Sequence, residues 1–104
     1  MTRRIVVERA AEQDLIEATL YLRERSPDTA RRFVPAARQT FVFLAAQPDI
    51  GRLYDASHPR LQDLRVWRIR GFDQYLLFYR ATEETLFIVR VLYGTRDIEG
   101  ILAN

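Results

Sequence analysis

The spacing of hydrophobic residues changes from helical to strand-like near residue 64 of this chain. Before that point Ala11, Leu15, Ala18 and Leu22 recur at the three- and four-residue spacing of an amphipathic helix. After it, stretches such as VWRIR and YLLFYR are rich in aromatic and β-branched residues, which favour strands. Between residue 10 and the C-terminal part, the chain is therefore expected to build a helical layer first and most of a sheet second.

The helical half is expected to form two helices joined by a tight turn. The first runs from about residue 10 to residue 25. Ser26-Pro27-Asp28 then supplies a cap, a first-turn proline and an acid for the positive end of the next helix. Pro35 lies inside the second helix, where it removes a hydrogen bond and should cause an irregularity. The motif PDIG at 48–51 ends this helix, whose apolar stripe is expected to consist of Phe33, Ala37, Phe41 and Leu44.

The rest of the chain is expected to be mostly strand. Residues 5–7 form a first strand, residues 52–63 a loop, and residues 64–70, 74–81 and 86–93 three strands whose short turns imply an antiparallel meander. A short helix should follow Gly94. The order β-αα-βββ(α) predicts a single two-layer α+β domain over residues 1–104, with a helical hairpin packed on a mainly antiparallel sheet.

Composition excludes several classes of function. The chain has no cysteine and one histidine, His58, so thiolate and histidine metal sites are not expected. No stretch is apolar enough for a signal peptide or a membrane span, which points to a reducing cytoplasm. The net charge is +2, and all sixteen basic residues are arginine, which suits bidentate pairing with carboxylates or phosphates but also fits codon bias.

Arginines alternate with apolar residues in the predicted meander. Side chains of a strand alternate between its two faces, so one set, including Trp67, Tyr75, Leu77, Phe87 and Val89, is expected to pack under the helices. The other face then gathers four arginines between apolar residues, which is typical of a binding surface. The alternative is that the arginines pair with nearby carboxylates such as Asp73, Glu83, Glu84 and Asp97 on a solvated face. The predicted binding face consists of Arg68, Arg70, Leu76, Phe78, Arg80, Ile88 and Arg90.

These residues resemble the ParE toxins of bacterial type II toxin–antitoxin modules, within the ParE/RelE toxin superfamily. The resemblance rests on WRIRGF at 67–72, YLLFYR at 75–80, IVRVL at 88–92 and GTRD at 94–97, and residues 11–51 resemble the helical hairpin of that family. It implies a ParD-like antitoxin whose disordered C-terminal tail folds onto the groove and sheet edge of the toxin, in a hetero-oligomer. It also implies inhibition of DNA gyrase by binding, without a cofactor, a metal or a catalytic residue.

The target-binding segment is expected in the C-terminal part of the chain. The residues proposed for it are Tyr93, Arg96, Asp97, Ile98 and Leu102, although Asp97 is equally suited to cap the terminal helix. Ser57 and His58 are adjacent, which is an unusual geometry for a hydrolase relay, so His58 is expected to be a loop residue.

Two other functions remain open from the sequence. The RelE branch cleaves mRNA on the ribosome, and here Arg68 or Arg70, Arg80 and Arg90 could supply the cations that such chemistry needs. The acid–base groups are weaker, because the chain lacks lysine and no Tyr or His follows Tyr93. A degenerate, non-toxic relative is the third possibility.

Overall fold

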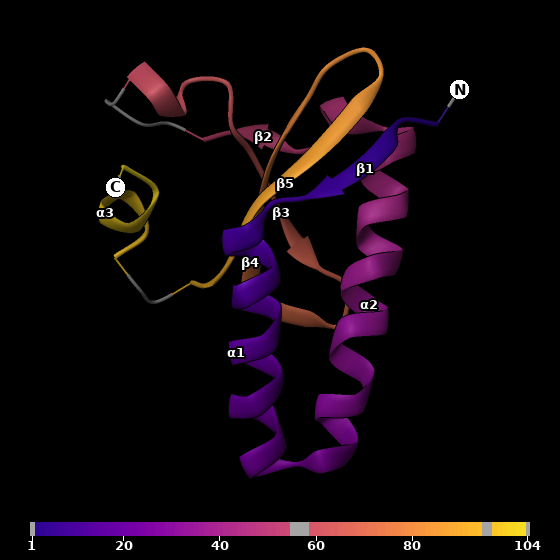
Figure 1. Cartoon of the computed structure of the whole chain (residues 1–104), viewed down its shortest axis with the longest axis vertical. Coiled ribbons are helices and arrows are strands. Elements are labelled where there is room, and N and C mark those ends of the chain that lie inside the picture. Colours follow the sequence, from indigo (N-terminus) through magenta and orange to yellow (C-terminus); the bar gives the residue numbers. More distant parts are fainter. Residues whose placement is uncertain (1, 55–58, 95–96, 104) are drawn as a thin grey trace.

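The computed structural model describes residues 2–54, 59–94 and 97–103. A hairpin of two long helices covers one face of a five-stranded sheet, and a short C-terminal helix lies to one side (Figure 1). This confirms the predicted two-layer α+β class. The elements in chain order are β1 (Arg4–Val7), α1 (Arg9–Arg25), α2 (Pro27–Ala46), the 3-10 helix η1 (Pro48–Ile50), β2 (Arg52–Leu53), the 3-10 helix η2 (Pro59–Leu61), β3 (Arg65–Ile69), β4 (Phe72–Ala81), β5 (Thr85–Tyr93) and α3 (Ile98–Ala103).

The two helices meet at Ser26, as the sequence predicts. The Ser26 hydroxyl accepts a hydrogen bond of 3.3 Å from the Thr29 N–H, and Pro27 occupies the first position of α2. The α2 helix runs without interruption through Pro35, which lies on its exposed side. Solvent can therefore satisfy the carbonyl group that proline leaves without an N–H donor.

The sheet has the strand order β1-β5-β4-β3-β2. Strands β3, β4 and β5 form the predicted antiparallel meander, and β1 pairs with β5 in parallel. The prediction of a loop over residues 52–63 is wrong at its start, because β2 pairs with Arg65 and Val66 of β3. A strand of only two residues is too short to give a periodic signal in the sequence, so its formation depends on pairing with β3.

A β-bulge reverses the predicted orientation of half of β5. Phe78 pairs with Arg90 but Tyr79 pairs with Ile88, so Val89 is the extra residue on β5. The alternation of side chains shifts by one at this point. Leu86 and Ile88 therefore lie in the core beneath the helices, and the prediction that Phe87 and Val89 pack there is wrong.

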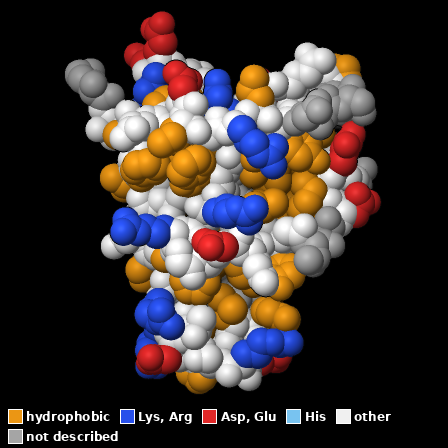
Figure 2. All heavy atoms as spheres, turned by 180° about the vertical axis from the view of Figure 1, so that it is seen from behind, with side chains coloured by type: hydrophobic (Ala, Val, Ile, Leu, Met, Phe, Trp, Pro, Cys, Tyr) orange, Lys and Arg blue, Asp and Glu red, His pale blue; other side chains and the backbone are white. Residues whose placement is uncertain are grey.

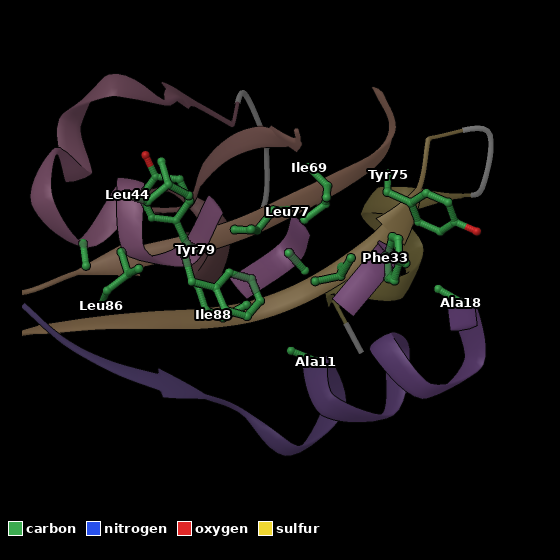
Figure 3. Packing of buried hydrophobic residues seen from close by; sticks show 14 residues of the cluster. Ala11, Ala18, Phe33, Leu44, Ile69, Tyr75, Leu77, Tyr79, Leu86 and Ile88 are labelled. Carbon is green, nitrogen blue, oxygen red and sulfur yellow. The ribbon is translucent and has the colours of Figure 1, made fainter. Parts of the chain in front are cut away.

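The main core lies between the helical hairpin and the sheet (Figure 3). Small residues of α1, Ala11 and Ala18, allow close approach, and Phe33 of α2 packs edge-to-face on Tyr75 at 4.9 Å between ring centroids. The predicted stripe of α2 is confirmed, since Phe33, Ala37, Phe41 and Leu44 are all buried. Trp67, expected in this core, is only partly buried at its border.

A second, smaller cluster lies on the opposite face of the sheet. Val66, Phe78 and Leu92 are buried there, and α3 covers them with Ile98, Ile101 and Leu102. The prediction of an open binding face is thus wrong in this region. The cause is tertiary, because the apolar side of a six-residue helix returns to the sheet and shields it from water.

Candidate functional site

A groove runs along the free edge of β3. Its volume is about 680 Å³. Side chains of α2, the turn after α2, β2 and β3 form its walls, so it passes from the helical layer around the sheet edge to the opposite face. We call it the edge groove; it is lined by Gln39, Thr40, Phe43, Ile50, Arg52, Val66, Trp67, Arg68, Ile69, Arg70, Gly71, Asp73 and Leu76.

The backbone of β3 has an unpaired position in this groove. The Tyr54 N–H donates to Leu64 C=O, so the even-numbered residues of β3 direct their N–H and C=O groups away from β4. Val66 pairs with Arg52 of β2, and the Arg70 N–H donates to the Thr40 hydroxyl at 3.2 Å. Since β2 ends there, the Arg68 N–H and C=O are left without a strand partner within the described chain.

Apolar side chains flank this edge. Phe43 and Ile50 are 39% and 41% exposed, and the Phe43 ring lies 6.1 Å from the ring of Trp67. Leu53, which follows Arg52 on β2, is 54% exposed. The groove thus offers apolar contacts on both sides of an open backbone position, as a site for an extended peptide requires.

The charge of the edge groove is positive. Its lining contains Arg52, Arg68 and Arg70 and a single acid, Asp73. Arg68 donates a hydrogen bond to the backbone C=O of Asp73, and none of the three guanidinium groups forms an ion pair within the part of the chain that is described. On the face opposite the helices, hydrophobic side chains gather in separate patches with blue arginine side chains between them (Figure 2).

The turn after α2 holds one wall of the groove in place. The buried Tyr79 hydroxyl donates to Pro48 C=O at 2.7 Å and accepts from the Gly51 N–H at 3.0 Å. Arg65 donates to Gly51 C=O at 2.7 Å from the other side. The PDIG motif therefore fixes Ile50 at the mouth of the groove.

We expect Tyr79→Phe to lower the free energy of unfolding by about 2 kcal/mol, because Pro48 C=O and Gly51 N–H lose their partner inside the protein. Burial raises the pKa of the Tyr79 phenol above its ordinary value of 10.0, although the Gly51 hydrogen bond partly opposes this. The folded state therefore keeps the proton at a pH where the unfolded state loses it. The resulting stability is present below pH 10 and is lost as the pH rises beyond it.

Urea unfolding followed from about pH 8 to about pH 11 measures both effects. The decline in stability above pH 10 should be shallower in Tyr79→Phe, but not absent, since burial also raises the pKa of Tyr75 and Tyr54. An identical decline in both proteins would contradict the assignment to Tyr79.

The arginines of the predicted binding face do not converge. Arg68 and Arg70 line the edge groove, whereas Arg80 forms an ion pair with Asp63 at 3.2 Å. Arg90 lies on β5 and binds the carboxylate of Asp14 on α1 through two hydrogen bonds, of 2.7 and 2.9 Å. The carboxylates that pair with them come from distant parts of the chain, which strand alternation does not reveal.

The apolar members of that face also separate. Leu76 lines the edge groove, but Phe78 is fully buried beneath Tyr54, whose ring centroid lies 5.4 Å from its own. Ile88 is fully buried in the main core because of the bulge. The prediction that Ile88 shares an exposed face with Arg90 is wrong.

The C-terminal residues proposed for target binding have structural contacts. The Tyr93 ring packs edge-to-face on Tyr75, and its hydroxyl donates to Gln74. Asp97 caps α3 by accepting the Gly100 N–H at 3.2 Å, and Ile98 and Leu102 pack on the second cluster. Arg96 and His58 lie outside the described residues.

Among the groove residues that the sequence did not indicate are Phe43, Ile50 and Arg52. Phe43 is a large apolar residue outside the buried stripe of its helix. Its position in the helical repeat could therefore have indicated a contact outside the core. The others follow the helix in a segment expected to be loop, where no periodicity indicates burial or exposure.

The described residues contain neither a metal cluster nor a membrane-spanning helix. No group of three or more His, Asp or Glu residues there could hold a metal ion. No helix there combines the length and apolar character needed to cross a membrane.

Comparison with known proteins identifies the family. The chain matches, over residues 5–98, the family described as the ParE toxin of the type II toxin–antitoxin system parDE. No curated protein matches it. Its fold is similar to a solved chain titled "Chromosomal ParDE TA system from P. aeruginosa", with a TM-score of 0.72 and 16% identity over 88% of this chain and 96% of that one. The chain therefore belongs to the ParE toxin family of type II toxin–antitoxin systems.

Proposed function

We propose that this toxin is neutralised by a ParD-like antitoxin whose tail binds in the edge groove, and that the free toxin inhibits DNA gyrase by binding. The observation that carries the first part is the open backbone position at Arg68, enclosed by apolar side chains and three arginines. Family membership supports the second part.

The lining of the edge groove indicates which side chains the antitoxin tail should carry. An extended segment can add to β3 by exchanging hydrogen bonds with the N–H and C=O of Arg68. Its side chains then alternate, so that apolar ones meet Phe43, Ile50 and Trp67 while acidic ones meet Arg52 and Arg70. An acidic and apolar tail therefore fits better than a basic one.

The nuclease alternative has less support. Phosphodiester cleavage needs cations that are free to stabilise the transition state. Two of the candidates, Arg80 and Arg90, are held by Asp63 and Asp14, and Arg90 is separated from Arg68 by the width of β4. Such arginines contribute more to the fold than to a reacting phosphate.

A gyrase assay with supercoiled plasmid and ATP tests the function. Purified toxin should cause linear cleaved DNA to accumulate, and pre-incubation with the cognate antitoxin should abolish it. Growth arrest without any effect on gyrase would overturn the gyrase proposal and direct the test to ribosome-dependent cleavage of mRNA. The absence of both activities would favour a degenerate relative.

The groove is tested by reversing its charge. The double variant Arg52→Glu/Arg70→Glu should bind the antitoxin about 100-fold more weakly, because two attractive contacts become repulsive. It should also keep poisoning gyrase in the presence of antitoxin. Arg23→Glu/Arg32→Glu, at the free end of the helical hairpin (Figure 1), is the matched control. Unchanged antitoxin affinity in the groove variant, with gyrase poisoning intact, would disprove the groove and leave the gyrase proposal standing.

A further inference from the structure

The side of the helical hairpin that faces away from the sheet carries exposed apolar residues. Ile16, Leu20 and Val42 are 53%, 46% and 57% exposed. No other described element crosses this side of α1 and α2, which lie side by side in front of the sheet (Figure 1). Single exposed apolar residues are ordinary, but Ile16 and Leu20 line one cavity, and Val42 lies one helical turn beyond Arg38 of the same lining.

That cavity is a groove of about 450 Å³ between the two helices. We call this surface the outer hairpin face; it is lined by Glu12, Leu15, Ile16, Thr19, Leu20, Val34 and Arg38. Along α1 the residues at 12, 16 and 20 share one side of the helix, and those at 34, 38 and 42 share one side of α2. The surface has no lining residue in common with the edge groove.

The two charged residues of the outer hairpin face have opposite signs. Glu12 on α1 and Arg38 on α2 are both exposed, and neither forms an ion pair within the described chain. A surface with one acid and one base on facing helices is complementary to a copy of itself. A uniformly acidic or basic partner would match only one of the two charges.

The positions of the lining residues along the helix axes determine which residues would face each other between two copies. Glu12 lies fourteen residues before Ser26 and Arg38 twelve after it, so the two differ in height by only about 3 Å at 1.5 Å per residue. Ile16 lies ten residues before Ser26 and Val34 eight residues after it, so these two also differ in height by about 3 Å. A two-fold axis in the plane of the interface, parallel to the helices, keeps each height and exchanges α1 for α2. It therefore sets Glu12 against Arg38 of the second copy, and Ile16 against Val34.

We propose that the outer hairpin face binds a second copy of this chain, forming a four-helix bundle in which each α1 packs antiparallel to α2 of the other copy. Such a contact is isologous, since each copy presents the same residues to the other. The whole outer side of the hairpin is about 25 Å long, the length of the 17-residue α1, and about 20 Å across, the width of two helices. It therefore offers at most on the order of 500 Å² per copy, near the lower limit for specific interfaces. The dimer is therefore expected to dissociate in the micromolar range.

Sedimentation velocity of the purified toxin, from about 1 to about 200 μM, tests this proposal. The wild type should change from monomer to dimer with concentration, and Ile16→Arg should raise the dissociation constant at least about 30-fold. Leu53→Arg is the control, because Leu53 is 54% exposed but lies on β2. A toxin that stays monomeric throughout, or a dimer that Ile16→Arg does not weaken, would overturn the proposal.

A charge exchange tests the two-fold arrangement itself. Glu12→Arg and Arg38→Glu should each weaken the dimer about tenfold, because each places like charges together across the interface. The double variant should recover wild-type association, since opposite charges then face each other again. Failure of the double variant to recover would rule out this axis. Circular dichroism of each variant confirms that these exposed positions leave the fold intact.

Discussion

Replacing Arg90 with alanine is expected to lower the free energy of unfolding by about 3 kcal/mol, in one of the two largest effects predicted for this protein. Asp14 is only 6% exposed, and its carboxylate accepts two hydrogen bonds from Arg90 and one of 2.9 Å from the Val91 N–H. The hydrogen bond to Asp14 raises the pKa of Arg90 above its ordinary value. Without the guanidinium group, a buried negative charge remains with one backbone donor.

The ion pair of Asp14 with Arg90 lies at the edge of β5 that β1 does not cover. Strand β1 ends at Val7 opposite Ile88, so the edge of β5 beyond that point has no neighbouring strand. Asp14 supplies the acceptor that a further strand residue would have supplied to Val91. Helix α1 thereby closes this edge of the sheet, whereas the edge at β3 stays open.

Denaturant unfolding with a double-mutant cycle checks this prediction. Asp14→Asn/Arg90→Leu removes both charges but keeps an acceptor for the Val91 N–H, so it should recover more than half of the loss. Arg70→Ala, an exposed arginine, should change stability by less than about 0.5 kcal/mol. If Arg90→Ala lowers the unfolding free energy by as little as Arg70→Ala, the buried Asp14 carboxylate does not depend on Arg90.

Gly51→Ala is expected to cost about 3 kcal/mol of unfolding free energy by overpacking. A Cβ at this position would overlap the Tyr79 hydroxyl and stand 2.9 Å from the Val66 C=O oxygen. The Gly51 φ of −72° suits any residue, so space and not conformation requires glycine here. Because the turn carries Ile50, the same change should also weaken antitoxin binding.

Removing the Tyr79 hydroxyl should relieve part of the overlap with a Cβ at position 51, which distinguishes overlap from other causes of the stability loss. Tyr79→Phe removes the overlapping oxygen, so the double variant should lose at least about 1 kcal/mol less than the sum of the single variants. Gly94→Ala is the control, since a Cβ there comes no closer than 3.4 Å to another residue and should cost less than about 1 kcal/mol. Additive losses measured by thermal or urea unfolding would disprove direct overlap.

Only part of the candidate site could be predicted from the sequence. Arg68, Arg70 and Leu76 belong to the predicted face and do line the edge groove. Phe78 does lie on the predicted side of the sheet, but Tyr54 and α3 cover it. Ile88 was assigned to the same side by strand alternation, which is reliable only while the register is regular. One extra residue at Val89 moved Ile88 to the other side of the sheet, and nothing local in the sequence marks that residue.

Local sequence determined the elements of this protein. The helical spacing of Ala11 to Leu44, the Ser26 cap and the aromatic strands act over a few residues, so they can be read without a partner. Tertiary structure decided the sites, because the ion pair of Asp14 with Arg90 spans 76 residues and that of Arg80 with Asp63 joins β4 to a loop. An arginine on a strand looks the same whether a distant carboxylate neutralises it or not. Only the packed fold decided that Arg52 and Arg70 face an open groove while Arg90 closes an edge.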